Sequence, residues 1–148
     1  MSNLYGYFTA EDDATAAATL DDAPDPVRFE VLDGGGIEPA VRLGTLEALL
    51  RGIPYEQVMA DPRHCKRISN RDSGSRWVVA LADTLRDALA AATADQLAEA
   101  AVPWSQTDEF QLFGGTDADL LTGWLGELAD LARHAQARSH HLYCWISL

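Results

Sequence analysis

Residues 139–148, SHHLYCWISL, decide how the fold is interpreted, because they form either a ligand cluster or the last strand of a sheet. Their aromatic residues and isoleucine favour a strand. Alternate side chains of a strand point to opposite faces. One face then holds His140, Leu142, Cys144, Ile146 and Leu148, and the other holds His141, Tyr143, Trp145 and Ser147. The first set is typical of a core face, with Cys144 as a small buried apolar residue.

This alternation argues against a metal site at the end of the chain. His141 and Cys144 point in opposite directions on a strand. His140 and Cys144 share a face, but four residues of strand separate them by about 13 Å. A zinc ion, with ligand bonds near about 2 Å, cannot bridge that distance. We therefore expect no metal and no cofactor here. Whether the second face contacts another layer of this protein, a ligand or another chain is left open.

A second strand is predicted at the other end, over Leu4–Ala10, because Tyr, Phe and Thr favour the pleated surface. We expect it to neighbour the terminal strand. The alternation in VRFEV (27–31) predicts a third strand, followed by a glycine turn at 34–36. Apolar spacing and capping signals predict helices over 11–23, 43–52, 54–60, 76–91, 93–100 and 117–137. Thr9 is the expected cap of the first helix, and Thr93 and Gln96 have the spacing of a capping box. The apolar stripe of the last helix includes Leu120, Leu121, Leu125 and Leu128. Residues 102–115 are expected to be irregular.

Strands at the two ends with helices between them predict an α+β fold. The sheet is small, includes the N- and C-terminal strands, and is covered by several helices. A chain of 148 residues fits one domain, so residues 1–148 are expected to form a single globular unit.

The chain is strongly acidic, with a formal net charge of -12. Residues 1–38 carry a net -8, residues 39–76 a net +3, and residues 77–148 a net -7. This balance argues against general nucleic-acid binding and suits a basic protein partner. The sequence has neither a membrane-spanning run nor a secretory signal, so we expect a cytoplasmic protein with reduced cysteines and no membrane association.

The one basic segment, residues 63–76, is a candidate anion site. Lys66, Arg67, Arg71 and Arg76 are interleaved with Ser, Asn and Gly and are expected to precede a helix N-terminus, which attracts anions. The same bases could instead neutralise the acidic first segment. Cys65 lies among these bases, which would favour its thiolate. A histidine from elsewhere would have to complete any catalytic pair, and a structural cysteine is the alternative.

Aromatic residues suggest a surface for a partner. We name Trp104, His141, Tyr143 and Trp145 as its candidate residues, although such side chains often belong to a core or its margin. Asp108 and Glu109 lie beside Trp104, but adjacent carboxylates point apart on most backbones and do not specify acid–base catalysis.

The order of elements resembles that of the YfbM-like family of uncharacterised bacterial proteins. The shared features are the GYF of residues 6–8, the helical middle, the aromatic turn before the last long helix, and a short strand at the end. Residues 63–76 have no counterpart in this resemblance. It implies an α+β fold and brings no activity or catalytic residues with it.

Two hypotheses follow from these observations. In the first, the protein is a non-enzymatic acidic binding protein that acts through a protein–protein surface, for example as an immunity-type neutraliser of a basic partner. In the second, it is a domain or enzyme that binds a small anion or metabolite at residues 63–76, with Cys65 or a histidine carrying any chemistry. Oligomeric state is not indicated by the sequence.

Overall fold

The computed structural model describes residues 4–69, 75–111 and 117–148. In this part of the chain there are five strands and seven helices. The strands are β1 (Leu4–Ala10), β2 (Val31–Gly35), β3 (Lys66–Arg67), β4 (Arg76–Ala80) and β5 (His141–Ser147). The helices are α1 (Asp13–Ala17), α2 (Val41–Arg51), α3 (Tyr55–Met59), α4 (Asp83–Ala91), α5 (Ala94–Ser105), α6 (Asp108–Gln111) and α7 (Ala118–Ala137). The fold is α+β, as the order of patterns predicted.

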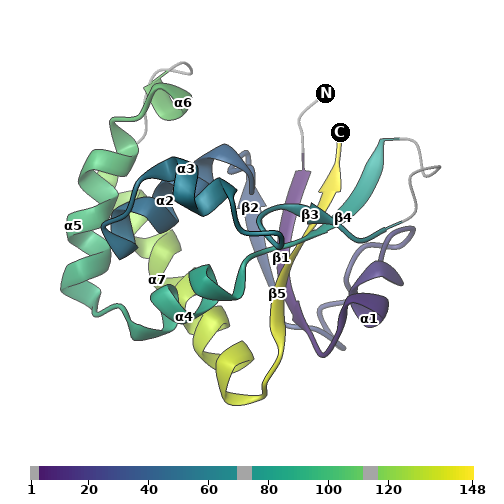
Figure 1. The fold of residues 1–148 in the computed structure, drawn as a ribbon. Helices are drawn as coiled ribbons and strands as arrows, with labels where there is room; N and C mark the ends of the chain where they lie inside the picture. The colour runs from purple at the N-terminus through teal and green to yellow at the C-terminus, as the bar shows by residue number, and fades with distance from the viewer. Residues whose placement is uncertain (1–3, 70–74, 112–116) are drawn as a thin grey trace.

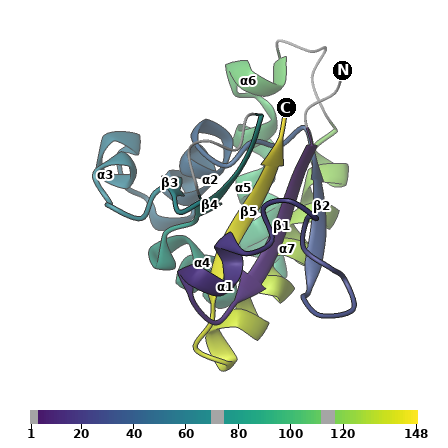
Figure 2. The same ribbon diagram turned by 90° about the vertical axis from the view of Figure 1, so that its right-hand side faces the viewer.

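The strands form one antiparallel sheet in the order β2-β1-β5-β4-β3. The two terminal strands are neighbours, as expected, and β5 lies between β1 and β4 (Figure 2). Tyr7 is opposite Cys144 on one side of β5, and Val79 is opposite Cys144 on the other. The last strand therefore holds the two halves of the sheet together.

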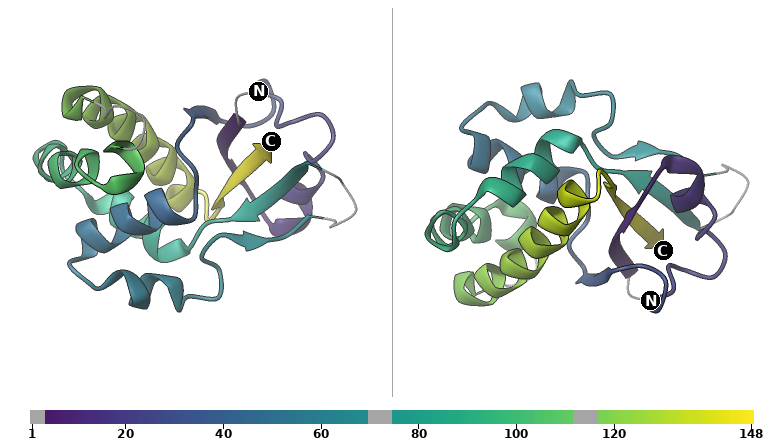
Figure 3. Two further views of the ribbon diagram at one scale, coloured as in Figure 1. Left: turned by 90° about the horizontal axis from the view of Figure 1, so that it is seen from above. Right: turned by 90° about the horizontal axis from the view of Figure 1, so that it is seen from below.

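Helices cover one face of the sheet almost completely. Figures 1 and 3 show α2, α4, α5 and α7 on this side. The alternation predicted for β5 is confirmed, because Leu142, Cys144 and Ile146 are buried in the core cluster shared with these helices. Helix α7 packs against both α4 and α5. The large core thus lies between the sheet and the helical layer.

The opposite face is covered by α1 and the segment that follows it (Figure 1). Phe8, Val78 and Tyr143 are fully buried in a second, smaller cluster with Ala16 and Leu20. Both faces of the central strands are therefore protected from water. Side chains of β5 that a one-sided sheet would expose instead contact another layer of the same protein.

Two helices match their sequence signals closely. Helix α5 begins with a capping box, in which the Thr93 side chain accepts from the Gln96 backbone N–H and the Gln96 side chain accepts from the Thr93 backbone N–H. In α7 the stripe including Leu121, Leu125 and Leu128 is buried. Leu120, which the pattern placed on that stripe, is 71% exposed.

The single helix predicted over 76–91 is wrong. Residues 76–80 form strand β4, and the helix begins only at Asp83. The sequence RWVVA is a short apolar run whose periodicity fits a strand or a helix equally well. Its side chains are buried on both faces of the sheet, Val78 toward α1 and Val79 toward the helical layer.

The strand predicted from Val27 begins later than expected, at Val31. Asp25 organises the preceding residues as a turn, because its side chain accepts from the Val27 backbone and its carbonyl accepts from the Phe29 backbone. Val27 is accordingly 94% exposed. Gly34, expected in a turn, lies in β2 against Tyr7, whose ring leaves no space for a Cβ atom.

Two smaller predictions also fail. Thr9 belongs to β1, and it is Asp12 that caps α1 by accepting from the Thr15 backbone N–H at 2.8 Å. The segment expected to be irregular from residue 102 instead continues α5 through Pro103 to Ser105 and then forms α6. No helix among the described residues is long and apolar enough to cross a membrane.

Candidate functional site

The structure joins the acidic N-terminal segment, the basic segment and the last strand in one polar cluster. The Tyr143 hydroxyl donates to Asp13 Oδ1 at 2.7 Å. Arg63 donates to both oxygens of the same carboxylate, through Nη2 at 3.2 Å and Nη1 at 3.4 Å. Its guanidinium also lies 6.0 Å from the centre of the Tyr143 ring. Asp13 is therefore the shared acceptor of an arginine and a tyrosine from distant parts of the chain.

The electrostatics of this cluster favour the ionised Asp13. Partial burial opposes its charge, but the hydrogen bonds from Arg63 and Tyr143 hold the pKa of Asp13 below its usual value. Burial, together with the bond to Asp13, raises the pKa of Tyr143. Tyr143 is thus a stable donor at neutral pH, and Asp13, held by two donors, is poorly placed to accept a proton from a substrate.

His141 lies beside this cluster and is paired with a different acid. Its Nδ1 is 2.8 Å from Asp83 Oδ1, and its ring meets the Tyr143 ring edge-on with centroids 6.4 Å apart. In the neutral form, a proton on Nδ1 would leave Nε2 as the acceptor. Arg86 also lies 3.5 Å from Asp83. Within the described residues, no group of three or more His, Cys, Asp or Glu could hold a metal ion.

The four residues predicted as a partner surface do not form one. Trp104 and Tyr143 are both fully buried, and they lie in different core clusters on opposite faces of the sheet. Trp104 Nε1 donates to the Arg42 carbonyl at 2.8 Å, and Trp145 Nε1 donates to the Leu20 carbonyl at 2.9 Å. His141 is paired with Asp83, so all four side chains make contacts within the protein. The second face of β5 therefore packs against another layer of the same protein.

The basic segment does not lead into a helix, so the helix N-terminus expected there is absent. Arg76 begins β4 instead and donates to the Asp21 carbonyl at 2.8 Å. Lys66 and Arg67 form the short edge strand β3 and are exposed, with the Arg67 guanidinium 5.1 Å from the Trp77 ring centre. Arg71 lies outside the described residues. The ion pair between Arg63 and Asp13 agrees with the alternative that the bases neutralise the acidic first segment, whereas Arg76 contacts only the backbone of that segment.

The cysteines occupy core positions. Cys144 is fully buried, and Cys65 packs against the same cluster. Burial raises the pKa of Cys65 to about 11, with a further contribution from Glu38, so the expected stabilised thiolate is not formed. His64 points to α2, where a Cβ on Gly44 would lie 2.9 Å from its ring. Both cysteines are therefore structural, and Cys65 is not a nucleophile with a lowered pKa.

One part of the helical layer, formed by α5, α6 and most of α7, is strongly acidic, with a net charge equal to that of residues 1–38. Residues 93–132 contain eight acidic residues and no Lys, Arg or His. They are Asp95, Glu99, Asp108, Glu109, Asp117, Asp119, Glu127 and Asp130. Seven of them are exposed and Glu109 is half-buried. Helices α5 and α7, which carry most of them, lie away from α1 on the far side of the sheet (Figure 3).

Basic side chains close to this layer are already engaged. Arg133 donates to the carbonyls of Ala90 and Ala92 as well as to Asp130. Arg42 donates to the carbonyl of Glu109, and its guanidinium stacks 4.8 Å from the Phe110 ring centre. These arginines therefore join segments of the fold, and most of the acidic charge of α5–α7 faces solvent.

No protein-family model, curated protein or solved structure matches the chain. The resemblance to the YfbM-like family therefore stays a prediction that rests on its residues alone.

Sequence reasoning missed both the Asp13 cluster and the acidic helical layer as units. The sequence does carry a signal for the layer, because residues 93–132 contain no base. The net charge summed over residues 77–148 obscures this signal. The cluster had none, because Asp13, Arg63 and Tyr143 meet only through the pairing of β1, β4 and β5 and the packing of α1.

Proposed function

We propose that the protein is a non-enzymatic binding protein that recognises a basic protein partner through the acidic layer formed by α5, α6 and α7. An immunity-type protein that neutralises a basic toxin is one form of this function. A cytoplasmic location remains part of the proposal.

The observation that supports it most directly is the separation of charge. Eight acids without a base lie over residues 93–132, and nearly all are exposed. A solvent-facing layer of one sign accelerates encounter with a partner of opposite sign and selects against partners of the same sign.

Exposed apolar side chains accompany the acids. Leu120 at the start of α7 is 71% exposed, and Val102 on α5 is 49% exposed. Stable protein interfaces combine an apolar centre with a polar rim. The acidic layer therefore offers both the charge for steering and the apolar surface for a contact that lasts.

The proposal is tested by co-purification from the native host, with matched charge-reversal variants. Asp95→Lys with Glu127→Lys replaces two negative charges of the layer by two positive ones, a change of +4 in net charge. Glu11→Lys with Asp22→Lys makes the same change in net charge at exposed positions on the α1 side. We expect the first pair to lose the partner and the second pair to retain it, and we expect capture to weaken as salt is raised.

Two results would contradict this function. One is a monomer that captures nothing at low and at moderate salt. The other is equal loss of the partner in both variant pairs, which would indicate a general effect of net charge. A toxin gene adjacent to the gene for this protein would support the immunity-type form.

Anion binding by the basic segment is the second candidate, because one observation favours it. Lys66 and Arg67 are exposed, and neither forms an ion pair with a carboxylate among the described residues. A thermal-shift titration with inorganic phosphate tests it. We expect stabilisation that is lost in Arg67→Ala, and a flat response in the unmodified protein would remove this candidate.

A further inference from the structure

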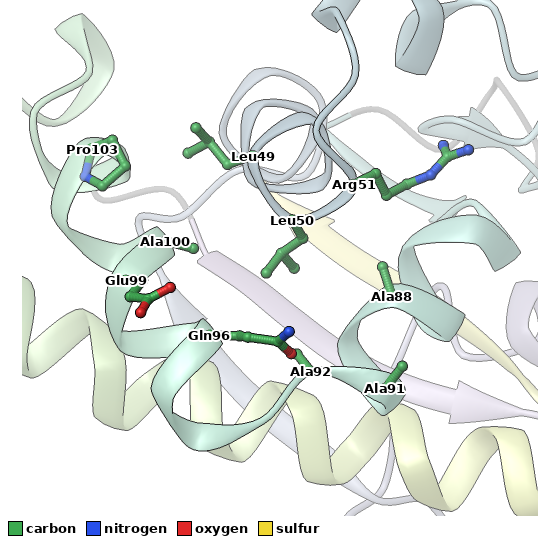
Figure 4. A pocket seen from close by; sticks show the side chains of 10 residues that line it. All are labelled: Leu49, Leu50, Arg51, Ala88, Ala91, Ala92, Gln96, Glu99, Ala100 and Pro103. Carbon is green, nitrogen blue, oxygen red and sulfur yellow. The ribbon is translucent and has the colours of Figure 1, made fainter.

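A groove runs between α2, α4 and α5 on the helical side of the molecule. Its cavity volume is about 570 Å³, and Figure 4 shows the ten side chains that line it. Leu49 and Leu50 come from α2, Ala88 and Ala91 from α4, and Glu99 from α5. Binding pockets in proteins fall between about 300 and 1,000 Å³, so the groove is large enough to receive side chains of a partner.

The groove exposes polar and apolar surface in nearly equal amounts, and its apolar side chains differ in size. Seven of its ten lining residues are Leu, Ala or Pro. Leu49 is 39% exposed on the α2 side, whereas the α4 wall carries only the methyl groups of Ala88 and Ala91. The groove forms because small side chains on α4 lie opposite larger ones on α2. An apolar side chain that entered it would be removed from water, which stabilises binding by roughly 25 cal/mol per Å² of buried apolar area.

The charge at the rim is negative. Glu99 lines the groove, and Asp95 lies one turn earlier on the same face of α5. The single base in the lining, Arg51, donates to the buried carboxylate of Glu47 at 2.7 Å, and the Thr84 hydroxyl donates to the same oxygen at 2.8 Å. The charge of Arg51 is thus balanced within the protein, and Glu99 and Asp95 face solvent.

We propose that this groove receives a basic amphipathic helix of the partner, whose apolar side chains enter it while Lys or Arg side chains meet Asp95 and Glu99. This inference rests on the proposed function and specifies how the partner is held. A helix that lies in an apolar groove presents its anchors at intervals of three or four residues. With its apolar anchors in the groove at this spacing, the partner helix has cationic residues on its flank that lie beside Asp95 and Glu99.

The charge of the rim selects this occupant over two others. A second copy of the chain would bring another acidic surface and a net charge of -12, so like charges would oppose the contact. A small neutral molecule could fill the cavity but would have no use for Asp95 and Glu99. Only a basic amphipathic segment uses both the apolar lining and the acidic rim.

The test measures binding of a labelled helical peptide of Leu and Lys, about 18 residues or five turns long, by fluorescence anisotropy. The matched peptide carries Glu in place of Lys. Ala91→Trp fills the groove from an exposed position, and Ala98→Trp places the same ring at an exposed position of α5 outside the lining. Glu99→Lys and Glu11→Lys form a second pair, in which Glu11 is an exposed position on the α1 side, outside the acidic layer.

We expect the basic peptide to bind and the acidic peptide not to bind. Ala91→Trp and Glu99→Lys should each weaken the basic peptide at least tenfold, whereas Ala98→Trp and Glu11→Lys should change its affinity less than threefold. Far-UV circular dichroism of each variant checks that the fold is retained.

Several outcomes would overturn the groove as the binding site. They are equal affinity for the two peptides, equal weakening by Ala91→Trp and Ala98→Trp, saturation of the groove by a neutral apolar compound that leaves peptide binding intact, or self-association that Ala91→Trp abolishes. If Ala91→Trp also leaves capture of the native partner intact while Asp95→Lys with Glu127→Lys removes it, the groove is wrong and the proposed function stands.

Discussion

The Tyr143 hydroxyl donates a 2.7 Å hydrogen bond to Asp13, and this bond fastens α1 to the central strand of the sheet. Arg63 binds the same carboxylate from a third part of the chain. We therefore expect Asp13→Asn to destabilise the protein by about 1–2 kcal/mol, because it weakens two hydrogen bonds to a charged group, one of them from a buried donor. Urea unfolding measures the change. Asp22→Asn, at an exposed position, is the control and should change stability by less than about 0.5 kcal/mol.

The same carboxylate should contribute to acid unfolding. The pKa of Asp13 is lower in the folded protein than its ordinary value of 3.8. Its contribution is therefore complete above about pH 4 and is lost as pH falls through the folded pKa. The urea midpoint of Asp13→Asn should fall less steeply than that of the unmodified protein below pH 4. Parallel pH profiles of the two proteins would contradict this linkage.

Gly34 is expected to tolerate no side chain. A Cβ atom there would clash with Tyr7 Cε2 and would lie 2.9 Å from the Tyr5 carbonyl oxygen, a backbone atom that cannot move freely. Gly34→Ala should destabilise the protein by about 1–3 kcal/mol through overpacking. Gly36→Ala, where a Cβ would meet nothing within 4 Å, is the matched control. The melting temperatures of Gly34→Ala and Gly36→Ala test this expectation. Equal values would show that the Tyr7 ring can move aside.

Glu47 is a buried acid, only 1% exposed, whose carboxylate accepts from Arg51 and Thr84. Glu47→Ala should cost about 2–4 kcal/mol, because it leaves the half-buried Thr84 donor and the Arg51 guanidinium without their acceptor. Glu47→Gln keeps the shape and one acceptor oxygen, so its cost should be clearly smaller. Chemical denaturation of both variants is the measurement, and equal losses would mean that charge, and not the acceptor, matters at this position.

Cys65 should react slowly with alkylating reagents. Burial raises its pKa from 9.0 to about 11, so the reactive thiolate is scarce at neutral pH. Iodoacetamide at pH 7 should modify the folded protein at least tenfold more slowly than the unfolded chain, as followed by mass spectrometry. Because the folded pKa is the higher one, the neutral thiol stabilises the fold below about pH 9, and this contribution is lost as pH rises toward 11. Rapid labelling at pH 7 would show that the thiol is activated after all.

Much of the fold could be predicted because the strongest patterns were local. The alternation of β5, the stripe of α7 and the Thr93–Gln96 capping box each depend on residues close in sequence. The strand β4 could not be separated from the helix after it, since RWVVA fits either period. Its strand conformation is decided by pairing with β5, a contact between residues far apart in the chain.

The candidate site was harder to predict for the same physical reason. Trp104 and Trp145 are amphipathic, and only the tertiary packing shows that their N–H groups donate to carbonyls of Arg42 and Leu20 inside the protein. Cys65 has basic neighbours in sequence, but burial dominates its pKa. Charge patterning is the exception, because the acidic helical layer was visible in the sequence and needed only a narrower window.

The central place of β5 has a consequence for synthesis of the protein on the ribosome. Residue Leu4 finds its partner only at Ser147, so β1 and β4 lack their shared inner neighbour until residues 141–147 have left the exit tunnel. Until then, the inner edges of β1 and β4 have unpaired backbone groups that other chains could use. Pairing between such distant residues also slows folding. A chain stalled just before β5 would be a natural client for chaperones, with most of its helices made and its sheet still in two halves.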